Sequence, residues 1–404
     1  MNILVINCGS SSFKYQLINM DNELVLSSGL VERIGEANGL LTHKVAPGSD
    51  GERKFQLGRS FPDHAAGMNA VMDLLVDPEK GVLASLKDIN AVGHRVVMGG
   101  EAIRASCLMG DREKKIVAEL SALAPLHNPA NLQGIEVAQA LLPHAPSVGV
   151  FDTEFHATLP PMAFMYALPY SLYEQQRIRR YGFHGTSHRF VARAGARLLG
   201  KNPEAFNAIT CHLGNGCSIT AVRNGRSVET SMGLTPLEGV VMGTRSGNID
   251  PAILLFLGRG QNMDFAALDA MLNKDSGLKG ICGLNDMRDI HEARAGGDEK
   301  AQLAFDIFCH GIRKYIGAYC AVLGRLDALI FTAGIGENDD LARAAICADL
   351  EILGLSIDQA KNARRSSGPR AISRDNSPVP VLVVPTNEEL AIAQETVAVL
   401  SGKK

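Results

Sequence analysis

A chain of 404 residues is long enough for two to three domains of about 150 residues, and it can bury a core without disulfides. The 40 Lys and Arg residues against 43 Asp and Glu residues give a net charge of −3, and 46% of the residues are hydrophobic. That composition excludes the basic excess of a nucleic-acid binder and the polarity of a disordered chain. We therefore expect a globular protein without a nucleic-acid partner.

The cysteines and the first residues predict where the protein works. The eight cysteines are widely scattered and form no C-x-x-C pair, which favours a reducing compartment. Residues 1–7 contain no basic side chain and too short an apolar stretch for a signal peptide, and no later run approaches about 18 uncharged apolar residues. The sequence predicts a cytoplasmic protein with no membrane partner.

Strand and helix patterns alternate along the chain. Short runs rich in β-branched residues predict strands at 3–6, 91–97, 147–151, 208–211, 328–332 and 379–384. Apolar residues at helical spacing predict helices at 131–142, 188–199, 301–322 and 388–400. No low-complexity linker separates the halves. This order is typical of an α/β protein with closely packed domains.

One pattern occurs twice in the chain. A strand (ILVIN) leads through the turn CGSSS into a second strand (FKYQLIN), a polar turn and a third strand (ELVLSSG). The same order returns as AITCH, LGNGC, SITAV, RNG and SVETSM, with Gly9 matching Gly214. Two unrelated hairpins could share this pattern by chance, but the conserved order favours a duplication and two related domains facing each other across a cleft.

Three glycine-containing turns are candidate phosphate sites. In the two repeated turns, small residues let backbone N–H groups approach an anion, and Lys14 follows the first turn as a point charge. The alternative for either turn alone is a simple hairpin. A third turn, Gly334-x-Gly336, follows a strand and opens a helix, where nucleotide phosphate or ribose can bind. It lacks the third glycine of the dinucleotide fingerprint, because Asp339 stands there.

Arginine, histidine and acidic residues stand beside glycines at the ends of apolar runs. They occur in GHRVVMGG with Arg95, in FDTEFH with Asp152, in RYGFHGTSH with His184, and in MGTRSG with Arg245. Arginine forks bind carboxylate and phosphoryl oxygens, whereas the alternative for each single residue is a capping or surface role. His184 and His188 have the i, i+4 spacing of zinc ligands, but no HExxH motif surrounds them.

The segment PTNEE follows the last strand and opens the final helix. Thr386 or Asn387 is suited to cap that helix, with acidic residues in its first turn. Glu388 at the same strand end could also hold Mg²⁺, directly or through water.

These motifs together resemble the acetate and propionate kinase family, within the actin, Hsp70 and sugar-kinase superfold known as ASKHA. The resemblance runs essentially end to end, through NCGSSSFK, HRVVMGG, APLHNPANLQGI, FDTEFH, RYGFHGTSH, HLGNGCSI, TSMGLTPLEGVVMGTRSGNIDP, FTAGIGEN and PTNEELAIA. It implies a duplicated α/β fold of two ASKHA domains with an interdomain cleft: residues 1–150, completed by the C-terminal helix 386–404, and residues 151–385, which bind nucleotide and form a homodimer.

The resemblance also implies a role for each matching residue. Asn7 and Glu388 would position Mg²⁺, and Lys14, Ser10 and Ser12 would contact phosphate. Arg95 would bind the substrate carboxylate, and Asp152 is the proposed acid/base residue. His184 and Arg245 would stabilise the transferring phosphoryl group. The pocket for the substrate methyl group would be formed by Val97, Leu126, Phe183 and Pro236. ATP would be held by His212, Leu213, Gly214, Asn215, Gly216, Asp286, Met287, Arg288, Gly334, Ile335, Gly336, Glu337 and Asn338.

The implied reaction is reversible, direct in-line phosphoryl transfer between ATP and acetate, giving acetyl phosphate and ADP, with Mg²⁺ or alternatively Mn²⁺. A carboxylate is already ionised at neutral pH, so it needs no strong base, and we expect Asp152 to orient an arginine or a metal-bound water. Val97 is expected to favour acetate over propionate. The alternatives are a propionate or butyrate kinase of the same family and an ATPase binding module of the same superfold.

Five positions depart from the family pattern. The family usually has His at Met98, Ala at Glu154, Phe at Leu234 and Met287, and Asp at Asn248. Strand alternation would put Glu154 on the same side as Asp152, where its charge would repel a carboxylate substrate. Met287 in place of an aromatic residue is expected to loosen the packing of adenine.

Overall fold

The computed structural model describes residues 1–125 and 127–403. The chain divides into two compact units, the first formed by Met1–Glu154 with Asn387–Lys404 and the second by Phe155–Thr386. The C-terminal helix therefore belongs to the first unit, although it follows the last strand of the second. None of the helices within the described residues has the length and apolar character needed to span a membrane.

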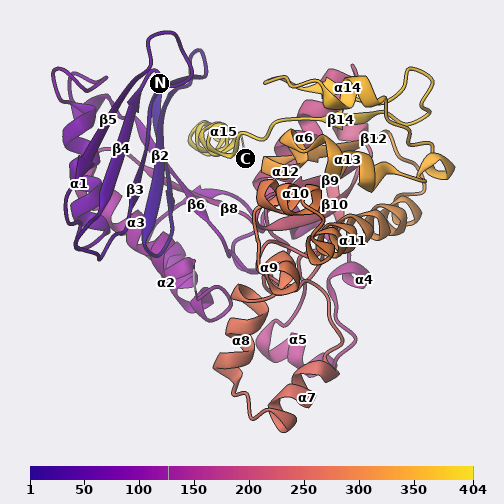
Figure 1. The fold of residues 1–404 in the computed structure, drawn as a ribbon. Coiled ribbons are helices and arrows are strands. Elements are labelled where there is room, and N and C mark those ends of the chain that lie inside the picture. Colours follow the sequence, from indigo (N-terminus) through magenta and orange to yellow (C-terminus); the bar gives the residue numbers. More distant parts are fainter. Residues whose placement is uncertain (126, 404) are drawn as a thin grey trace. The chain divides into compact units, whose positions relative to one another are not determined.

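The first unit is built on a sheet of eight strands in the order β5-β4-β3-β2-β1-β6-β8-β7. The strands β1 to β5 form an antiparallel meander, whereas β6 and β8 continue the sheet parallel to β1 (Figure 1). The strands are β1 (Asn2–Cys8), β2 (Ser12–Asn19), β3 (Leu24–Glu32), β4 (Leu40–Val45), β5 (Arg53–Gly58), β6 (Ala91–Val96), β7 (Cys107–Leu108) and β8 (Ser147–Phe151). The helices are α1 (His64–Leu75), α2 (Asp111–Glu119), α3 (Asn128–Leu141) and α15 (Glu388–Leu400).

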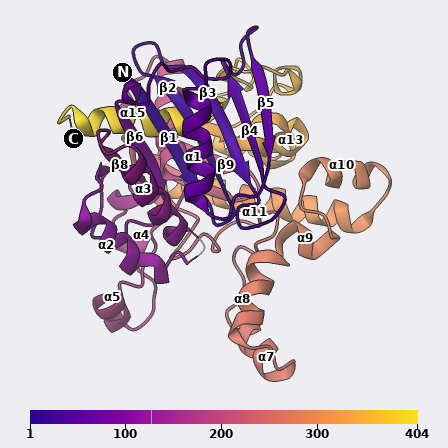
Figure 2. The ribbon, with the colours of Figure 1, turned by 90° about the vertical axis from the view of Figure 1, so that its left-hand side faces the viewer.

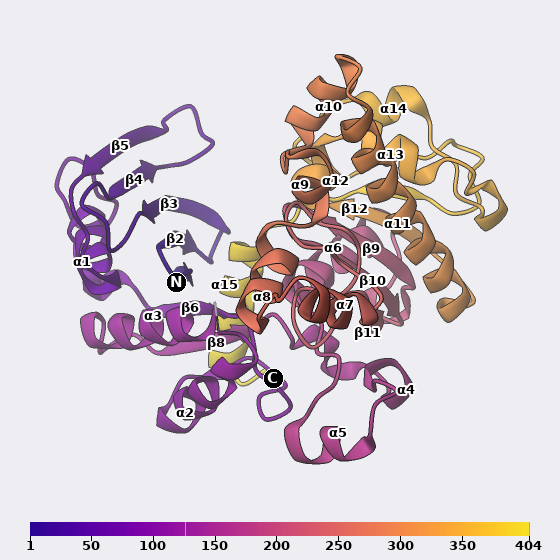
Figure 3. The ribbon, with the colours of Figure 1, turned by 60° about the horizontal axis from the view of Figure 1, so that its bottom comes forward.

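The second unit is built on a sheet of six strands in the order β11-β10-β9-β12-β14-β13, on which α6 and α11 pack (Figure 3). The strands are β9 (Ala208–Leu213), β10 (Cys217–Arg223), β11 (Arg226–Thr230), β12 (Ala328–Thr332), β13 (Arg370–Ala371) and β14 (Val381–Val383). The helices are α4 (Pro161–Phe164), α5 (Tyr170–Gln176), α6 (Gly185–Leu198), α7 (Ala252–Gly260), α8 (Phe265–Lys274), α9 (Gly277–Cys282), α10 (Met287–Ala295), α11 (Glu299–Leu323), α12 (Ala333–Asn338), α13 (Asp340–Cys347) and α14 (Gln359–Ala363).

The predicted internal repeat is confirmed by the two sheets. The order β3-β2-β1-β6-β8 in the first matches β11-β10-β9-β12-β14 in the second, and both combine an antiparallel meander with two parallel strands. Each sheet also has a register shift at the same place, between Leu17 and Ile18 in β2 and between Ala221 and Val222 in β10. The repeat therefore extends to irregularities of individual strands, which chance similarity of two hairpins does not explain.

Strand alternation divides the core of the first unit into two layers. Leu4 and Ile6 of β1 face the helices α1 and α3, with Phe13, Tyr15 and Leu17 of β2 in the same layer. Ile3 and Val5 point the other way and pack against Ile392 and Ala393 of α15. The face covered by α15 also carries the candidate site residues Asn7 and Lys14.

Alternation acts in the same way in the second unit. Ala208 of β9 and Val222 of β10 pack against Val191, Ala192 and Ala196 of α6. The alternate residues of β10 face α11 instead. Thr210 and His212 therefore share the α6 face of β9 with Ala208.

Candidate active site

Three candidate residues of the first unit lie on one face of its sheet. Asn7 follows Ile3 and Val5 in alternation, so its side chain is on the α15 face, and Lys14 is its partner across β1 and β2. Arg95 follows Ala91 and Gly93 on the same face of β6, where an added Cβ at Gly93 would meet Ile392 and Thr396 of α15. Parallel strands bring these residues to one edge, because β1 and β6 end side by side.

Asp152 follows β8 at the same edge and holds Arg95 in a two-pronged ion pair. Its Oδ1 accepts from Nε of Arg95 at 3.0 Å, and its Oδ2 accepts from Nη2 at 2.7 Å. Burial lowers the pKa of Arg95, but the charges of Asp152 and Glu388 outweigh this effect and leave that pKa above its ordinary value. Asp152 thus holds the charged Arg95 guanidinium in one orientation.

Glu388 is the first residue of α15 and lies in the same group. Asn387 caps the helix through its side-chain oxygen, which accepts from the N–H of Leu390 at 3.0 Å, so the cap is Asn387 rather than Thr386. Burial raises the pKa of Glu388, the charge of Asp152 adds to this rise, and Arg95 and Lys14 oppose it. Glu388 therefore lies within electrostatic reach of all three charged groups.

Two asparagines of α3 support the end of β6, and they were not among the residues singled out from the sequence. Asn131 accepts from the N–H of Val97 at 3.0 Å and donates to the carbonyl of Cys8 at 2.8 Å. Asn128 accepts from Met98 N–H and donates to Met98 C=O, both at 3.1 Å. The motif HNPANLQGI contains both residues, but their partners are only evident once α3 is placed against the sheet.

Glu154 and the serines Ser10 and Ser12 were also predicted to affect the site of this unit. The expectation that Glu154 shares a strand face with Asp152 is wrong, because β8 ends at Phe151 and the N–H of Glu154 turns back to the carbonyl of Phe151. The Glu154 carboxylate is buried and accepts from Ser106 Oγ at 2.5 Å. Ser10 and Ser12 lie in and after the turn closed by the Gly9 N–H to Ser12 C=O bond of 2.8 Å.

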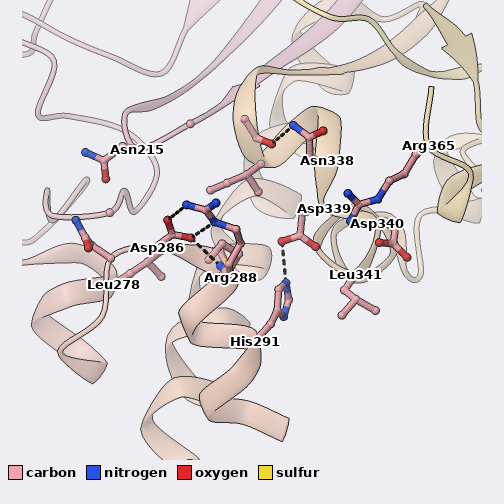
Figure 4. A pocket seen from close by; sticks show the side chains of 16 residues that line it. Asn215, Leu278, Asp286, Arg288, His291, Asn338, Asp339, Asp340, Leu341 and Arg365 are labelled. Carbon is pink, nitrogen blue, oxygen red and sulfur yellow. Dashed lines mark hydrogen bonds and ion pairs between the residues drawn. The ribbon is translucent and has the colours of Figure 1, made fainter. Parts of the chain in front are cut away.

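The second unit contains a cavity of about 800 Å³ (Figure 4). Its size is typical of a site for a nucleotide-sized ligand. Eight of the predicted ATP-binding residues line it: Gly214, Asn215, Asp286, Met287, Arg288, Gly334, Ile335 and Asn338. The cavity also has lining residues that the sequence did not suggest: Gly243, Leu278, Asn285, His291, Asp339, Asp340, Leu341 and Arg365.

Ion pairs and hydrogen bonds shape the wall of this cavity. Asp286 caps α10 by accepting from the Arg288 N–H, and its carboxylate also accepts from the Arg288 side chain at 2.9 and 2.6 Å. These hydrogen bonds hold the pKa of Asp286 at about 2. His291, also on α10, pairs with Asp339 at 2.8 Å (Figure 4). Met287 is buried at the start of α10, where the family usually has Phe.

The other five predicted ATP-binding residues do not line the cavity: His212, Leu213, Gly216, Gly336 and Glu337. The Glu337 carboxylate turns back to its own helix, where Oε1 accepts from Ala333 N–H at 2.8 Å, and the same oxygen accepts from Thr386 N–H after β14 at 3.0 Å. Leu213 is buried in β9. His212 and Gly216 belong instead to a polar group around His184.

His184 and Arg245 converge on one point beside Gly216. A Cβ on Gly216 would lie 3.4 Å from Arg245 Nη1 and 3.7 Å from His184 Nε2. The His184 ring stacks on His212, with the ring centroids 4.1 Å apart. His184 has a left-handed backbone with φ of 56°, which is uncommon for a residue other than glycine and typical of functional sites. The absence of a side chain at Gly216 keeps this point open.

Arg245 belongs to a loop that is held in place by hydrogen bonds of two arginine side chains. Arg245 Nη1 donates to the carbonyl of Pro236 at 3.1 Å, and further along the loop Glu238 accepts from Arg180 Nη2 at 2.7 Å. Arg180 also donates to the carbonyls of Thr230 and Ser231. Burial lowers the pKa of Arg245.

Asn248, where the family usually has Asp, closes the same loop. Its side-chain oxygen accepts from Gly239 N–H at 2.9 Å, and its amide donates to Tyr315 Oη at 2.7 Å. Asn248 therefore makes the bonds to Gly239 that an aspartate would make. Leu234 at the start of the loop donates its N–H to Tyr166 Oη at 2.9 Å.

The residues predicted for the methyl pocket belong to different units. Val97 is buried in the first unit, whereas Phe183 is buried and Pro236 partly buried in the second. Leu126 lies outside the described residues. The zinc alternative for His184 and His188 finds no support, since no group of three or more His, Cys, Asp or Glu residues in 1–125 and 127–403 is arranged to hold a metal ion.

Comparisons with known proteins show which family the chain belongs to. The family model described as the Acetokinase family matches residues 2–394. An acetate kinase from Nitratidesulfovibrio vulgaris is 60% identical over 403 residues, covering 100% of both chains. The crystal structure of Porphyromonas gingivalis acetate kinase is 41% identical with a TM-score of 0.94, covering 99% of each chain. That of a propionate kinase from Francisella tularensis is 43% identical with a TM-score of 0.90, covering 98% of each chain. The chain therefore belongs to the Acetokinase family.

Proposed function

We propose that this protein is an acetate kinase, which transfers a phosphoryl group reversibly between ATP and acetate and produces acetyl phosphate and ADP. The observation that carries the proposal is the pairing of Arg95 with Asp152 at the end of β6. Asp152 takes one N–H of Nε and one of Nη2, which leaves three of the five guanidinium N–H groups for an acceptor other than Asp152. A small carboxylate is the acceptor whose geometry fits such a fork.

Asp152 has the role of an orienting group in this reaction. An acetate oxygen attacks the γ-phosphorus of ATP, the new O–P bond forms as the bond to the bridging oxygen of ADP breaks, and no proton has to be removed. The requirement is to hold two anions in line, which is a matter of positioning and of positive charge. Arg95 in the first unit and Arg245 with His184 in the second supply this charge.

The residues around Glu388 fit a magnesium ion. Mg²⁺ prefers oxygen ligands and keeps several waters, so one carboxylate and one amide oxygen, from Glu388 and Asn7, are a sufficient protein contribution. The ion would neutralise charge on the phosphate oxygens during the transfer. Mn²⁺ has similar ligand preferences and is the alternative. Lys14 on the same face, with Ser10 and Ser12 in the adjacent turn, would contact phosphate.

ATP would occupy the cavity of the second unit. The carboxylate of Asp286 and the amides of Asn215 and Asn338 provide polar contacts for ribose and base, and Ile335 with Met287 provides apolar surface. Arg245 and His184 would contact the transferring phosphoryl group beside Gly216.

A propionate kinase is the second candidate, because a solved propionate kinase is 43% identical to this chain. Val97 favours acetate, since an added methylene must fit beside a buried branched side chain. One methylene changes binding by only about 1 to 3 kcal/mol, so some activity on propionate is expected as well.

Trapping of acyl phosphate by hydroxylamine tests the proposal directly. The full chain is assayed with ATP and Mg²⁺ and with acetate, propionate, butyrate or no acid. Product that depends on acetate and is strongest with acetate supports an acetate kinase, whereas a higher specificity constant for propionate supports the second candidate. ATP hydrolysis without dependence on any acid would contradict both and indicate an ATPase module.

The protein's assembly and location are further proposals. The helices α7 and α8 extend away from the sheet of the second unit (Figure 2), and they expose Phe256 at 70% and Phe265 at 92%. We propose that this arm packs against a second copy in a homodimer, and replacement of both phenylalanines by serine should then shift the sedimenting mass toward that of a monomer. A cytoplasmic location is supported by the eight cysteines, which are all free.

A further inference from the structure

Two segments of the second unit form the larger part of the cavity wall. One is residues 285–291, at the start of α10, and the other is residues 334–341, which include most of α12 and the start of α13. Within residues 1–125 and 127–403, one hydrogen bond joins α10 to these two helices, and it runs between His291 Nε2 and Asp339 Oδ2 at 2.8 Å. This bond therefore crosses from one part of the cavity wall to the other (Figure 4).

Asp339 is held at the junction of α12 and α13. Its backbone N–H donates to the carbonyl of Ile335 at 3.0 Å. Its Oδ1 accepts from the N–H of Ala342 at 2.9 Å and so caps α13. The other carboxylate oxygen, Oδ2, is the one that reaches a different helix, and His291 is its partner there.

His291 is held from its other side by Arg294. Nδ1 of His291 accepts from Nη1 of Arg294 at 2.8 Å, and Arg294 Nε donates to Oε1 of Gln302 at 2.9 Å. The guanidinium carbon also lies 3.6 Å from the ring centroid of Phe305, which is buried in α11. A line of contacts therefore runs from α11 through Arg294 and His291 to Asp339.

The partners of the His291 ring fix the direction of both of its hydrogen bonds. A guanidinium group has N–H donors and no acceptor, and an ionised carboxylate has acceptors and no donor. Nδ1 therefore has no proton, and Nε2 carries the single proton of a neutral ring. Turning the ring over would place carbon atoms against both partners, and an imidazolium would turn a second N–H toward Arg294.

The His291–Asp339 bond lies one helical turn from two apolar residues of the cavity wall. His291 comes four residues after Met287, and Asp339 comes four residues after Ile335. Residues at this spacing stand on the same side of a helix, and the bond from Asp339 N–H to Ile335 C=O keeps that geometry at the end of α12. Because Met287 and Ile335 both line the cavity, the bond limits how far apart the two are held.

We propose that His291 is a positioning residue which, together with Asp339, sets the width of a site for the nucleotide base between Met287 and Ile335. A planar base gains most when apolar atoms contact both of its sides, and a gap of about 0.5 to 1 Å already forfeits about a quarter to a half of a dispersion contact. The ligand class is a nucleoside phosphate, and the pair acts on its affinity and not on the transfer. The proposal rests on the proposed function, because it assigns this cavity to the nucleotide.

Calorimetric titration of the full chain with ADP tests the pair without an assay of activity. His291→Phe keeps a ring beside Phe305 and loses both hydrogen bonds. We expect it to weaken ADP binding by about 10-fold, the lower end of what a hydrogen bond to a charged group contributes. The matched control is His310→Phe, the same change at an exposed position of α11, which should bind ADP as the wild type does.

A second variant breaks the same bond from the other end. In Asp339→Asn the side-chain oxygen can still cap α13, but its amide N–H groups would face the Nε2–H of His291. If the two residues act through one bond, the double variant His291→Phe with Asp339→Asn should bind ADP as weakly as either single variant. A double variant whose loss is the product of the two single losses would overturn the proposal.

Rescue and kinetics separate positioning from a general loss of structure. His291→Gln offers an N–H to Asp339 and an oxygen to Arg294, so it should recover most of the affinity for ADP. In His291→Phe the KM for ATP should rise by about 10-fold while kcat and the KM for acetate stay unchanged, as expected for loss of uniform binding. ADP affinity in His291→Phe equal to that in His310→Phe would overturn the proposal.

Nuclear magnetic resonance of the wild-type chain labelled with ¹⁵N-histidine decides the matter if the variants fail to fold. A His291 ring with its proton on Nε2 alone supports the line of contacts, and a proton on Nδ1 would overturn it. Wild-type protein that does not bind ADP would refute the proposed function and the proposal with it. Wild-type binding that is fully retained in His291→Phe would refute the proposal alone.

Discussion

The two sheets have the same strand order but carry different chemistry on equivalent faces. In the first, Asn7 and Lys14 are opposite each other on β1 and β2, and in the second the corresponding pair on β9 and β10 is His212 and Ser218. The first face is completed by the Arg95–Asp152 ion pair, whereas the second contains imidazoles and hydroxyls joined by hydrogen bonds. The duplicated backbone thus provides equivalent positions in the two sheets. The side chains at these positions differ, so the two faces differ in chemistry.

The covering helices extend this comparison. The first face is covered by α15, which follows β14 of the second unit, and the second face is covered by α6, which follows β8 of the first. Glu388 is the first residue of α15, and His188 lies in the first turn of α6. A charged face is suited to bind a carboxylate and a cation, and a neutral hydrogen-bonded face is suited to orient groups at a phosphate.

The largest expected effect is in the second unit, at the loop that carries Arg245. Replacement of Arg245 by alanine should lower kcat by about 10³-fold, because an arginine on the transferring phosphoryl group typically contributes that much. Initial rates of acetyl phosphate formation provide the measurement. The control is Arg226→Ala, an exposed arginine of the same unit, which should keep wild-type kcat. A loss below 10-fold in Arg245→Ala would show that this loop does not stabilise the transfer.

Filling the space between Arg245 and His184 should have the next largest effect. An alanine Cβ at position 216 would make ordinary contacts of 3.4 Å or more, so the fold should be kept. The methyl group would displace the phosphoryl group, and a misplacement of about 1 Å costs about 10²-fold in kcat. Gly311→Ala, in α11 with nothing near the added Cβ, is the control. Unchanged kcat in Gly216→Ala would mean that the phosphoryl group lies elsewhere.

Shortening Val97 should change the preference of the enzyme for acetate over propionate. Val97→Ala should raise the specificity constant for propionate relative to acetate by about 10-fold, which corresponds to about one methylene of binding energy. Steady-state rates with each acid give the ratio. The ratio should not move in Ile103→Val, a change of similar size at a buried position that we do not assign to the methyl pocket. An unchanged ratio in Val97→Ala would refute the pocket assignment.

The smallest expected effect is a pH dependence of stability confined to α6. The pKa of His188 lies below its unfolded value of 6.5, so the unfolded state binds more protons, and stability is full above pH 6.5 and is lost as the pH falls below it. The loss should be at most about 1.4 kcal/mol per pH unit. Hydrogen exchange of the α6 amides between pH 7.5 and pH 5.5, corrected for the intrinsic rate, measures it. Constant protection over this range would contradict a neutral buried His188.

Much of this arrangement follows from local sequence patterns. The strands at 147–151 and 328–332 and the helix at 388–400 have the predicted bounds, because alternation and helical spacing are local properties. The helix around His188 was predicted to begin at that residue, whereas α6 begins at Gly185. The start is set by the left-handed backbone of His184, which the spacing of apolar residues does not reveal.

The partners of the site residues were harder to predict. The Arg95–Asp152 pair joins residues 57 positions apart, and the bond between Ser187 and Thr386 joins residues 199 apart. Glu337 has the motif position of a ligand-binding residue, but its carboxylate is used by its own helix. Such contacts depend on how strands from distant parts of the chain are brought together. The spacing of residues along the sequence does not predict that arrangement.

The measurement that tests the division between the two faces most directly is the kinetics of Asp152→Asn with acetate and ATP varied independently. The asparagine keeps the size of the side chain but loses the charge and one of the two bonds to Arg95. If Asp152 orients the carboxylate-binding arginine, the KM for acetate should rise by about 10²-fold while the KM for ATP stays within about two-fold of the wild type. A collapse of kcat with an unchanged KM for acetate would instead make Asp152 a catalytic base and would contradict the account.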